Sequence, residues 1–361
     1  MWLSVIIPAY NCRKTIKGVL NSIAIQDDPD VEVVICDDQS TDNFMELVEP
    51  YKEILHIVYG KTKPHKIHCP GNTRQDGLDM ASGDWVTFID NDDAFEPDVF
   101  FKIKQMIEQE NISDVVVSYF REWFPDTRSY DDKLHDEMTW MHGKFYNRQW
   151  LKDHNIFFKE DLESHEDLFF NSKVYASYIH KDIEYHFFPQ PTYRWIYNKE
   201  SLSRSFVEEQ YNYLEIHFKD WLYAAAQPWI DDYKVRPEPE NKDRLIGFML
   251  YSFFYCQGSI YRQGKENLYA ETREAIFEYE EVIKKLLNIT ELDILDWAYQ
   301  RPQEYANLKA LCEGGIGPFV EPESFAYFMQ DKSNLNFQNY TPLFYEDNKD
   351  ILDKDYLVDF L

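Results

Sequence analysis

Short apolar runs alternate with helical patterns along the first part of the chain. The apolar runs predict strands at residues 3–7, 31–36, 54–59, 85–89 and 115–119. Between them, the spacing of apolar positions predicts helices over 13–25, 43–52, 72–81 and 97–110. Runs that are almost wholly apolar are typical of strands covered on both faces. The pattern therefore predicts an α/β fold, with a mostly parallel sheet and helices on both of its faces.

The pattern changes at about residue 205. Long helical stretches are expected at 208–225, 243–263 and 269–287, and the proline-rich, charged stretch 227–242 is expected to be a loop. We therefore expect two domains, an α/β domain over residues 1–205 and a mainly helical C-terminal domain over residues 206–361.

Composition narrows the class of protein. The chain has 361 residues, of which 44% are hydrophobic, and a formal net charge of −28. The apolar fraction excludes a disordered chain, and the acidic balance argues against a general binder of nucleic-acid backbones, because such proteins present basic surfaces. Five dispersed cysteines without a C-x-x-C pair favour reduced thiols and a cytoplasmic location. We expect no transmembrane segment, which needs roughly 20 apolar residues, and the oligomeric state stays open.

The carboxyl ends of the predicted strands are the first place to look for a site, because open parallel sheets bind ligands there. Asp37 and Asp38 directly follow the strand at 31–36. A turn with a helix cap explains Ser40 and Asp42 well. It does not explain two adjacent acids at the strand end, where they repel each other. A carboxylate at this position can accept hydrogen bonds from a base or a ribose.

A second acidic cluster follows the strand at 85–89. It is Asp90-Asn91-Asp92-Asp93. Three carboxylates within four residues repel one another and ordinarily need a cation to coexist. Oxygen ligands select Mg²⁺ or Mn²⁺, which bind through one or two carboxylates and substrate phosphates. A solvated acidic turn explains this stretch equally well when it is considered alone.

A third cluster is His165-Glu166-Asp167. Carboxylates favour helix N-termini, so the local sequence favours the start of a surface helix. An acid beside other acids has its pKa raised, which suits a general base that works near neutral pH.

Several segments together form a recognisable order of motifs. They are SVIIPAYN (4–11), VICDDQSTD (34–42), NTRQDG (72–77), ASGDWVTFIDNDD (81–93), GKFYNR (143–148), HED (165–167), YRW (193–195) and SLS (201–203). In this order they resemble the family 2 glycosyltransferases with the GT-A fold. The resemblance covers about residues 3–205, and it departs at Gln39, where the family usually has glycine. Residues 206–361 lie outside the resemblance.

The resemblance implies an inverting transfer of a sugar from a nucleotide donor, most often a UDP-sugar, to a hydroxyl group. It implies that Asp167 is the general base and that Asp92 binds the divalent metal, Mn²⁺ or Mg²⁺, which neutralises the departing diphosphate. The donor-binding residues that it implies are Pro8, Ala9, Tyr10, Asn11, Asp38, Arg74, Asp90 and Asn91. Further residues expected in or near the site are Asp93, Glu166, His142, Arg194 and Ser201.

The acceptor is expected to be a carbohydrate, with the aromatic-rich C-terminal region closing over it. A hydroxylated DNA base, reached by base flipping, and a protein are alternative acceptors, although the net charge of −28 repels nucleic-acid phosphates. A nucleotidylyltransferase is disfavoured, because the turn at 8–11 lacks the Gly-rich phosphate loop that it needs. A non-catalytic nucleotide-sugar-binding module is a further alternative, and the presence of all the motif carboxylates argues against it.

Overall fold

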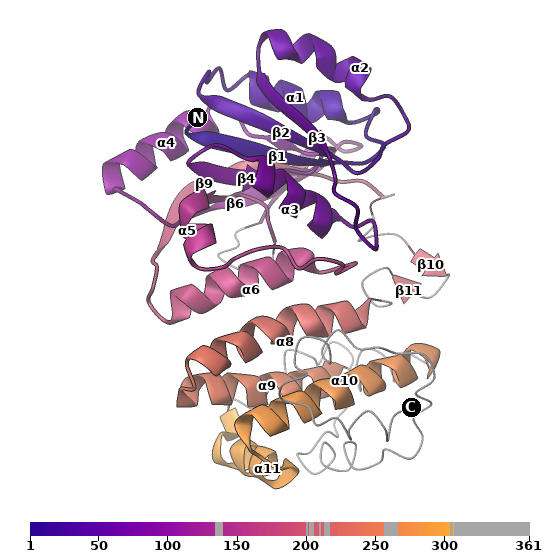
Figure 1. Cartoon of the computed structure of the whole chain (residues 1–361), viewed down its shortest axis with the longest axis vertical. Coiled ribbons are helices and arrows are strands. Elements are labelled where there is room, and N and C mark those ends of the chain that lie inside the picture. Colours follow the sequence, from indigo (N-terminus) through magenta and orange to yellow (C-terminus); the bar gives the residue numbers. More distant parts are fainter. Residues whose placement is uncertain are drawn as a thin grey trace. The chain divides into compact units, whose positions relative to one another are not determined.

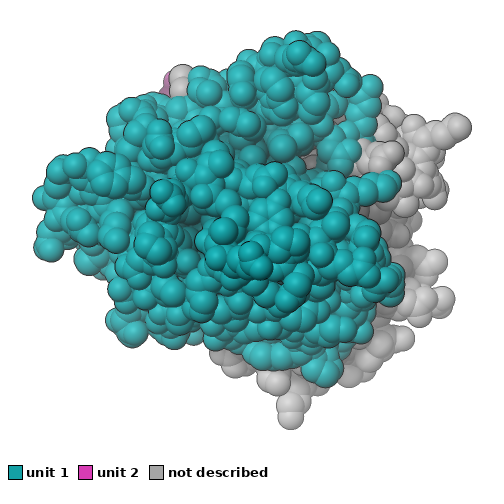
Figure 2. All heavy atoms as spheres, turned by 90° about the horizontal axis from the view of Figure 1, so that it is seen from above, with its two compact units in different colours: residues 1–201 teal, residues 202–361 magenta. Residues whose placement is uncertain are grey.

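The chain divides into two compact units. The computed structural model describes residues 1–133, 140–199, 201, 206–208, 211–212, 217–255, 266–303 and 306 (Figure 1). The first unit comprises residues 1–201 and the second residues 202–361, and Figure 2 shows the surface of the first unit in teal. The sequence predicts the boundary between the two domains near residue 205. Cys256 and Cys312 lie outside the described residues.

The first unit is built on one large sheet. Its strands are β1 (Leu3–Ala9), β2 (Val31–Asp37), β3 (His56–Lys61), β4 (Trp85–Phe88), β5 (Ala94–Phe95), β6 (Val115–Phe124), β7 (Ser129–Lys133), β8 (Lys144–Asn147) and β9 (Tyr185–Ile196). Their order is β3-β2-β1-β4-β8-β6-β9-β5, with β7 paired to β6. The pairs β1–β2, β2–β3, β1–β4 and β6–β9 are parallel, whereas β8 is antiparallel to both β4 and β6. The mostly parallel sheet predicted from the sequence is confirmed.

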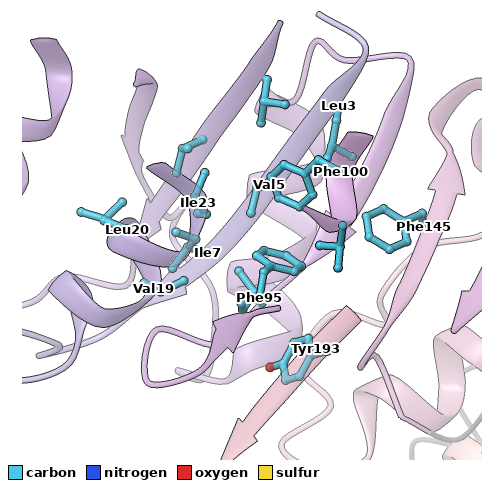
Figure 3. Packing of buried hydrophobic residues seen from close by; sticks show 14 of the residues in the cluster. Leu3, Val5, Ile7, Val19, Leu20, Ile23, Phe95, Phe100, Phe145 and Tyr193 are labelled. Carbon is cyan, nitrogen blue, oxygen red and sulfur yellow. The ribbon is translucent and has the colours of Figure 1, made fainter. Parts of the chain in front are cut away.

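Helices cover both faces of this sheet (Figure 1). They are α1 (Ile16–Ala24), α2 (Met45–Val48), α3 (Pro70–Met80), α4 (Val99–Glu110), α5 (Arg148–Asp153) and α6 (Glu166–Ile179). Successive side chains of a strand point to opposite faces. Val5 and Ile7 of β1 therefore pack with α1, α2 and α4, as Figure 3 shows for α1, whereas Ile6 packs with α3, α5 and α6.

The second unit is mainly helical. It contains β10 (Phe206–Glu208), β11 (Tyr211–Asn212), α8 (Phe218–Val235), α9 (Pro239–Tyr255), α10 (Glu266–Leu287) and α11 (Glu291–Gln300). Two predictions were wrong here: two short strands stand where the helix at 208–225 was expected to begin, and α8 and α9 occupy most of the expected loop at 227–242. Proline inside a helix costs about 3 kcal/mol, and the buried side chains that α8 contributes, among them Leu222 and Ile230, offset the cost of Pro228.

No helix in the described part of the chain has both the length and the apolar character that crossing a bilayer requires.

Two glycines test how closely α3 is packed on the sheet. A Cβ atom on the buried Gly77 would lie 2.6 Å from Ile6 Cγ2, whereas a Cβ atom on the exposed Gly18 of α1 would meet nothing within 4 Å. We expect Gly77→Ala to lower the free energy of unfolding by about 1–3 kcal/mol through overpacking. Gly18→Ala should raise it by about 0.4–1 kcal/mol, because alanine restricts the unfolded chain. Urea unfolding of both variants checks this, and equal effects would contradict it.

Candidate active site

Hydrogen bonds join the loops that follow β1, β2 and β4. The side chain of Asn91 donates to the carbonyl of Pro8 at 3.0 Å. The backbone N–H of Asn11 donates to Ser40 Oγ at 2.9 Å. The side chain of Tyr10 is 61% exposed, so its ring is open to a ligand. The loops that the sequence singled out therefore lie together at the carboxyl edge of the sheet.

Asp38 lies at this edge and is held by the segment that follows β3. Its Oδ1 accepts a hydrogen bond from Thr62 Oγ1 at 3.1 Å and lies 2.9 Å from Nδ1 of His68. The backbone N–H of Asp38 donates to the carbonyl of Ala9 at 2.8 Å, which ties it to the end of β1. The carboxylate is thus fixed at the edge of the sheet by neighbours from two other segments.

Arg74 of α3 connects two groups of carboxylates. Its Nη2 donates to Asp90 Oδ1 at 2.6 Å, and its Nη1 contacts Glu166 Oε1. Its side chain is only 9% exposed. Burial alone would lower the pKa of Arg74, but Asp90 and Glu166 raise it, so the guanidinium stays charged. Partial burial of Asp90 acts to raise its pKa, but the pKa lies below its ordinary value because Arg74 stabilises the carboxylate. The turn after β4 and the start of α6 are therefore joined by one cation.

The three carboxylates of the turn have different surroundings. Burial and the nearby charge of Asp90 raise the pKa of Asp92 to about 6, although the side chain of Asn198 donates a hydrogen bond to it. Asp93 is 2% exposed, and burial together with the charges of Asp92 and Asp90 raises its pKa well above its ordinary value. Its carboxylate accepts hydrogen bonds from Tyr193 Oη at 2.5 Å and from the Ile196 N–H at 2.8 Å. Burial and neighbouring charge thus act against ionisation at Asp92 and Asp93, whereas Arg74 stabilises the ionised form of Asp90.

Asp167 lies in the first turn of α6. The sequence interpretation of this cluster as a helix start agrees with the structure, in which α6 begins at Glu166. Burial and the neighbouring Glu166 raise the pKa of Asp167 to about 7, although Arg74 and Lys144 act to lower it. A carboxylate with this pKa can take up a proton near neutral pH and release it again.

Three other predicted residues have distinct environments. His142 stacks on Tyr193 with ring centroids 4.4 Å apart, and burial lowers its pKa to about 3, so its imidazole is neutral. Ser201 has a buried Oγ with no hydrogen-bond partner within the described ranges. The structure does not bring Arg194 to the carboxylates, because its guanidinium forms two hydrogen bonds with Glu96 at 3.0 and 3.1 Å.

Sequence reasoning missed Tyr193 and Asn198. Tyr193 directly precedes the predicted site residue Arg194 in the YRW motif. Because side chains alternate along a strand, only one of these two residues can face the turn. Asn198 had no local signal, since it reaches Asp92 from a distant segment of the chain.

The donor set suits a divalent cation. Carboxylate oxygens are the ligands that Mg²⁺ and Mn²⁺ prefer. Burial and the charge of Asp90 raise the pKa of Asp92, and a bound cation would offset both effects. Ligand atoms of Asp90, Asp93 and His142 also lie within 4.8 Å of one another. Arg74 and Tyr193 already engage the two carboxylates of that group, which leaves Asp92 as the better ligand.

Comparison with known proteins gives a consistent result. The model of the family described as "Glycosyl transferase family 2" matches residues 4–186, half of the chain. The chain is 33% identical to poly(ribitol-phosphate) beta-N-acetylglucosaminyltransferase TarS of Staphylococcus aureus over 192 residues. The aligned region covers 49% of this chain and 33% of that protein. It is 27% identical to poly(ribitol-phosphate) beta-glucosyltransferase of Bacillus spizizenii over 190 residues. That aligned region covers 48% of this chain and 30% of that protein. The aligned part of the chain spans about a third of the length of these relatives.

Solved structures agree with this result. The crystal structure of residues 1–349 of Staphylococcus aureus TarS has a TM-score of 0.59 at 22% identity and covers 87% of this chain and 91% of that one. The structure of its complex with UDP-GlcNAc has a TM-score of 0.52 at 21% identity, and the match covers 89% of this chain and 94% of that one. This likeness confirms the GT-A type fold with a helical C-terminal region. The match over half of its length shows that the chain belongs to glycosyl transferase family 2.

Proposed function

We propose that the chain transfers a sugar, with inversion, from a UDP-sugar to a hydroxyl group of a glycan-type acceptor, with Mn²⁺ or Mg²⁺ on the donor diphosphate. The single observation that carries the proposal is the Arg74 bridge. It holds the turn that contains Asp92 next to the start of α6, which contains Asp167. The bridge supports a mechanism in which a metal ligand and a base act on one substrate.

In this mechanism Asp167 takes the proton of the acceptor hydroxyl while the acceptor oxygen attacks the anomeric carbon. The new carbon–oxygen bond forms as the bond to the diphosphate breaks, and UDP leaves from the opposite face. A cation bound by Asp92 would neutralise the charge that builds up on the leaving diphosphate. The raised pKa of Asp167 supports its role as the base, and the exposed ring of Tyr10 supports a role in stacking on the nucleotide base.

The acceptor that we propose first is a polyol-phosphate chain. The names of two relatives, which describe transfer to poly(ribitol phosphate), support this choice. A hydroxylated DNA base and a protein hydroxyl are the other candidates. The net charge of −28 repels the phosphates of both polymers, so the names of the relatives, and not charge, favour the polyol phosphate over DNA.

The test measures UDP release and the mass of the product with UDP-GlcNAc or UDP-glucose, Mn²⁺ and poly(ribitol phosphate). Hydroxymethylated duplex DNA replaces the polymer in a second arm, over a series of salt concentrations. Sugar addition to the polymer supports the proposal. Addition to the DNA base, with binding that weakens steeply as salt rises, would overturn the acceptor assignment but leave the transfer chemistry intact.

Asp92→Asn tests the metal ligand. We expect Mn²⁺-dependent binding of UDP-sugar to be lost and turnover to fall by about 10²–10³-fold, because charge stabilisation at the leaving group is removed. Stability should not fall, since the variant removes a carboxylate that burial and Asp90 destabilise. Calorimetric titration of UDP with and without Mn²⁺ measures this. Asp27→Asn, at an exposed turn, is the matched control, and unchanged Mn²⁺ dependence in Asp92→Asn would refute the assignment.

Asp167→Asn tests the base. General-base catalysis contributes roughly 10²–10⁴-fold, so we expect transfer to fall by that factor. UDP-sugar binding should remain, because Asp167 acts on the acceptor. Steady-state kinetics and donor titration separate the two effects. A variant that loses donor affinity but still transfers sugar would count against this role.

The pH profile gives an independent check. The pKa of Asp167 is raised to about 7, and only its deprotonated form can accept the proton. We therefore expect kcat/KM to rise up to tenfold per pH unit between pH 6 and 7, more steeply below pH 6, where Asp92 is also protonated, and to level off above pH 7. A rate that falls as pH rises through 7 would be inconsistent with a carboxylate base.

A further inference from the structure

The segment that ends β9 contacts two neighbouring carboxylates of the turn in different ways. Tyr193 Oη donates to Asp93 Oδ2 at 2.5 Å and accepts from the backbone N–H of Asp90 at 3.3 Å. The Ile196 N–H donates to the other oxygen of Asp93 at 2.8 Å. The partner that the strand segment gives Asp92 is the neutral carboxamide of Asn198. Asp93 is thus bound on both oxygens, whereas Asp92 interacts with a group that a cation can replace.

Tyr193 is itself held rigidly. Its side chain is 1% exposed and belongs to the buried core of the first unit (Figure 3). Its ring lies edge-on to Phe95, with centroids 6.2 Å apart, and stacks on His142. Residue 193 also pairs with Phe95 in the β5–β9 ladder. The hydroxyl therefore has a fixed position, and so does the turn that it holds.

We propose that Tyr193 and Asp93 form a buried clip that positions the turn so that Asp92, and not Asp93, takes the divalent cation. Tyr193 is a positioning residue: it acts through Asp93 and the backbone of Asp90. The inference rests on the proposed function for the presence of the cation. Partners that orient metal ligands are typically worth 10–100-fold in metal affinity or activity.

The clip and a direct ligand role for Asp93 predict opposite results. Phenylalanine at position 193 keeps the buried ring but removes the hydroxyl. If Asp93 is an anchor, Tyr193→Phe loosens the turn and weakens Mn²⁺ binding. In Asp93→Asn the carboxamide oxygen can still accept from the Ile196 N–H, and its N–H can donate to Tyr193 Oη, so the variant keeps both contacts and should bind Mn²⁺ within a few-fold of the unmodified chain. If Asp93 is a ligand, Asp93→Asn should lose Mn²⁺ as fully as Asp92→Asn does.

The experiment titrates Mn²⁺ into the full chain in the presence of UDP and follows free Mn²⁺ by electron paramagnetic resonance. We expect about 10–100-fold weaker binding for Tyr193→Phe and near-normal binding for Asp93→Asn. Tyr51→Phe removes a tyrosine hydrogen bond of 2.7 Å to Asn21, outside the site, and is the matched control. Turnover of Tyr193→Phe should recover at excess Mn²⁺, whereas that of Asp167→Asn should not.

Loss of Mn²⁺ binding in Asp93→Asn, or normal binding in Tyr193→Phe, would overturn the clip. If Tyr193→Phe does not fold, as judged by circular dichroism, Asp93→Asn compared with Asp92→Asn still decides between anchor and ligand. If the unmodified chain binds no Mn²⁺ with UDP, both the clip and the metal part of the proposed function are wrong. If the Mn²⁺ results hold but no sugar is transferred to any acceptor tested, the clip stands and the proposed activity fails.

Discussion

A buried guanidinium between two carboxylates is the interaction on which the candidate site depends. Arg74 contacts Asp90, which follows β4, and Glu166, which begins α6. The pair of Arg74 with Glu166 is buried on both sides, and removing one partner from such a pair costs about 3–5 kcal/mol, because an uncompensated charge remains. The approach of α3 to α6 also depends on Gly71, where a Cβ atom would lie 2.8 Å from the Cβ of Glu166. Helix α3 therefore sets the distance between the two halves of the site.

The part of this arrangement that local sequence could predict is the edge of the parallel sheet. Apolar runs located β1, β2 and β4, and because parallel strands end at the same edge, the acids that follow them were expected to meet. The bridge by Arg74 was beyond such reasoning, since it joins residues 92 positions apart. In the second unit, the proline-rich stretch 227–242 predicts a loop, but Pro228 lies inside α8 because burial of that helix outweighs the local cost.

Strand β9 shows why the rest could not be predicted. Adjacent residues of a strand point to opposite faces, so Tyr193 reaches Asp93 whereas Arg194 pairs with Glu96. Sequence alone does not say which of the two faces the turn. That depends on the register of β9 against β5 and β6, which is set by contacts between residues far apart in the chain. Local pattern thus located the acids, and long-range pairing decided what each of them contacts.

Under the proposed function, the charges of the site explain why metal and donor would bind together. The diphosphate of a UDP-sugar is anionic, and Asp92 carries charge that neither Arg74 nor the clip compensates, so the two repel each other without a cation. Arg74 cannot supply the missing charge, because Asp90 and Glu166 already hold its guanidinium. A divalent ion held by Asp92 would supply the positive charge that both the carboxylate and the diphosphate require. An acidic chain can therefore bind an anionic donor without a basic surface, provided that the cation arrives with it.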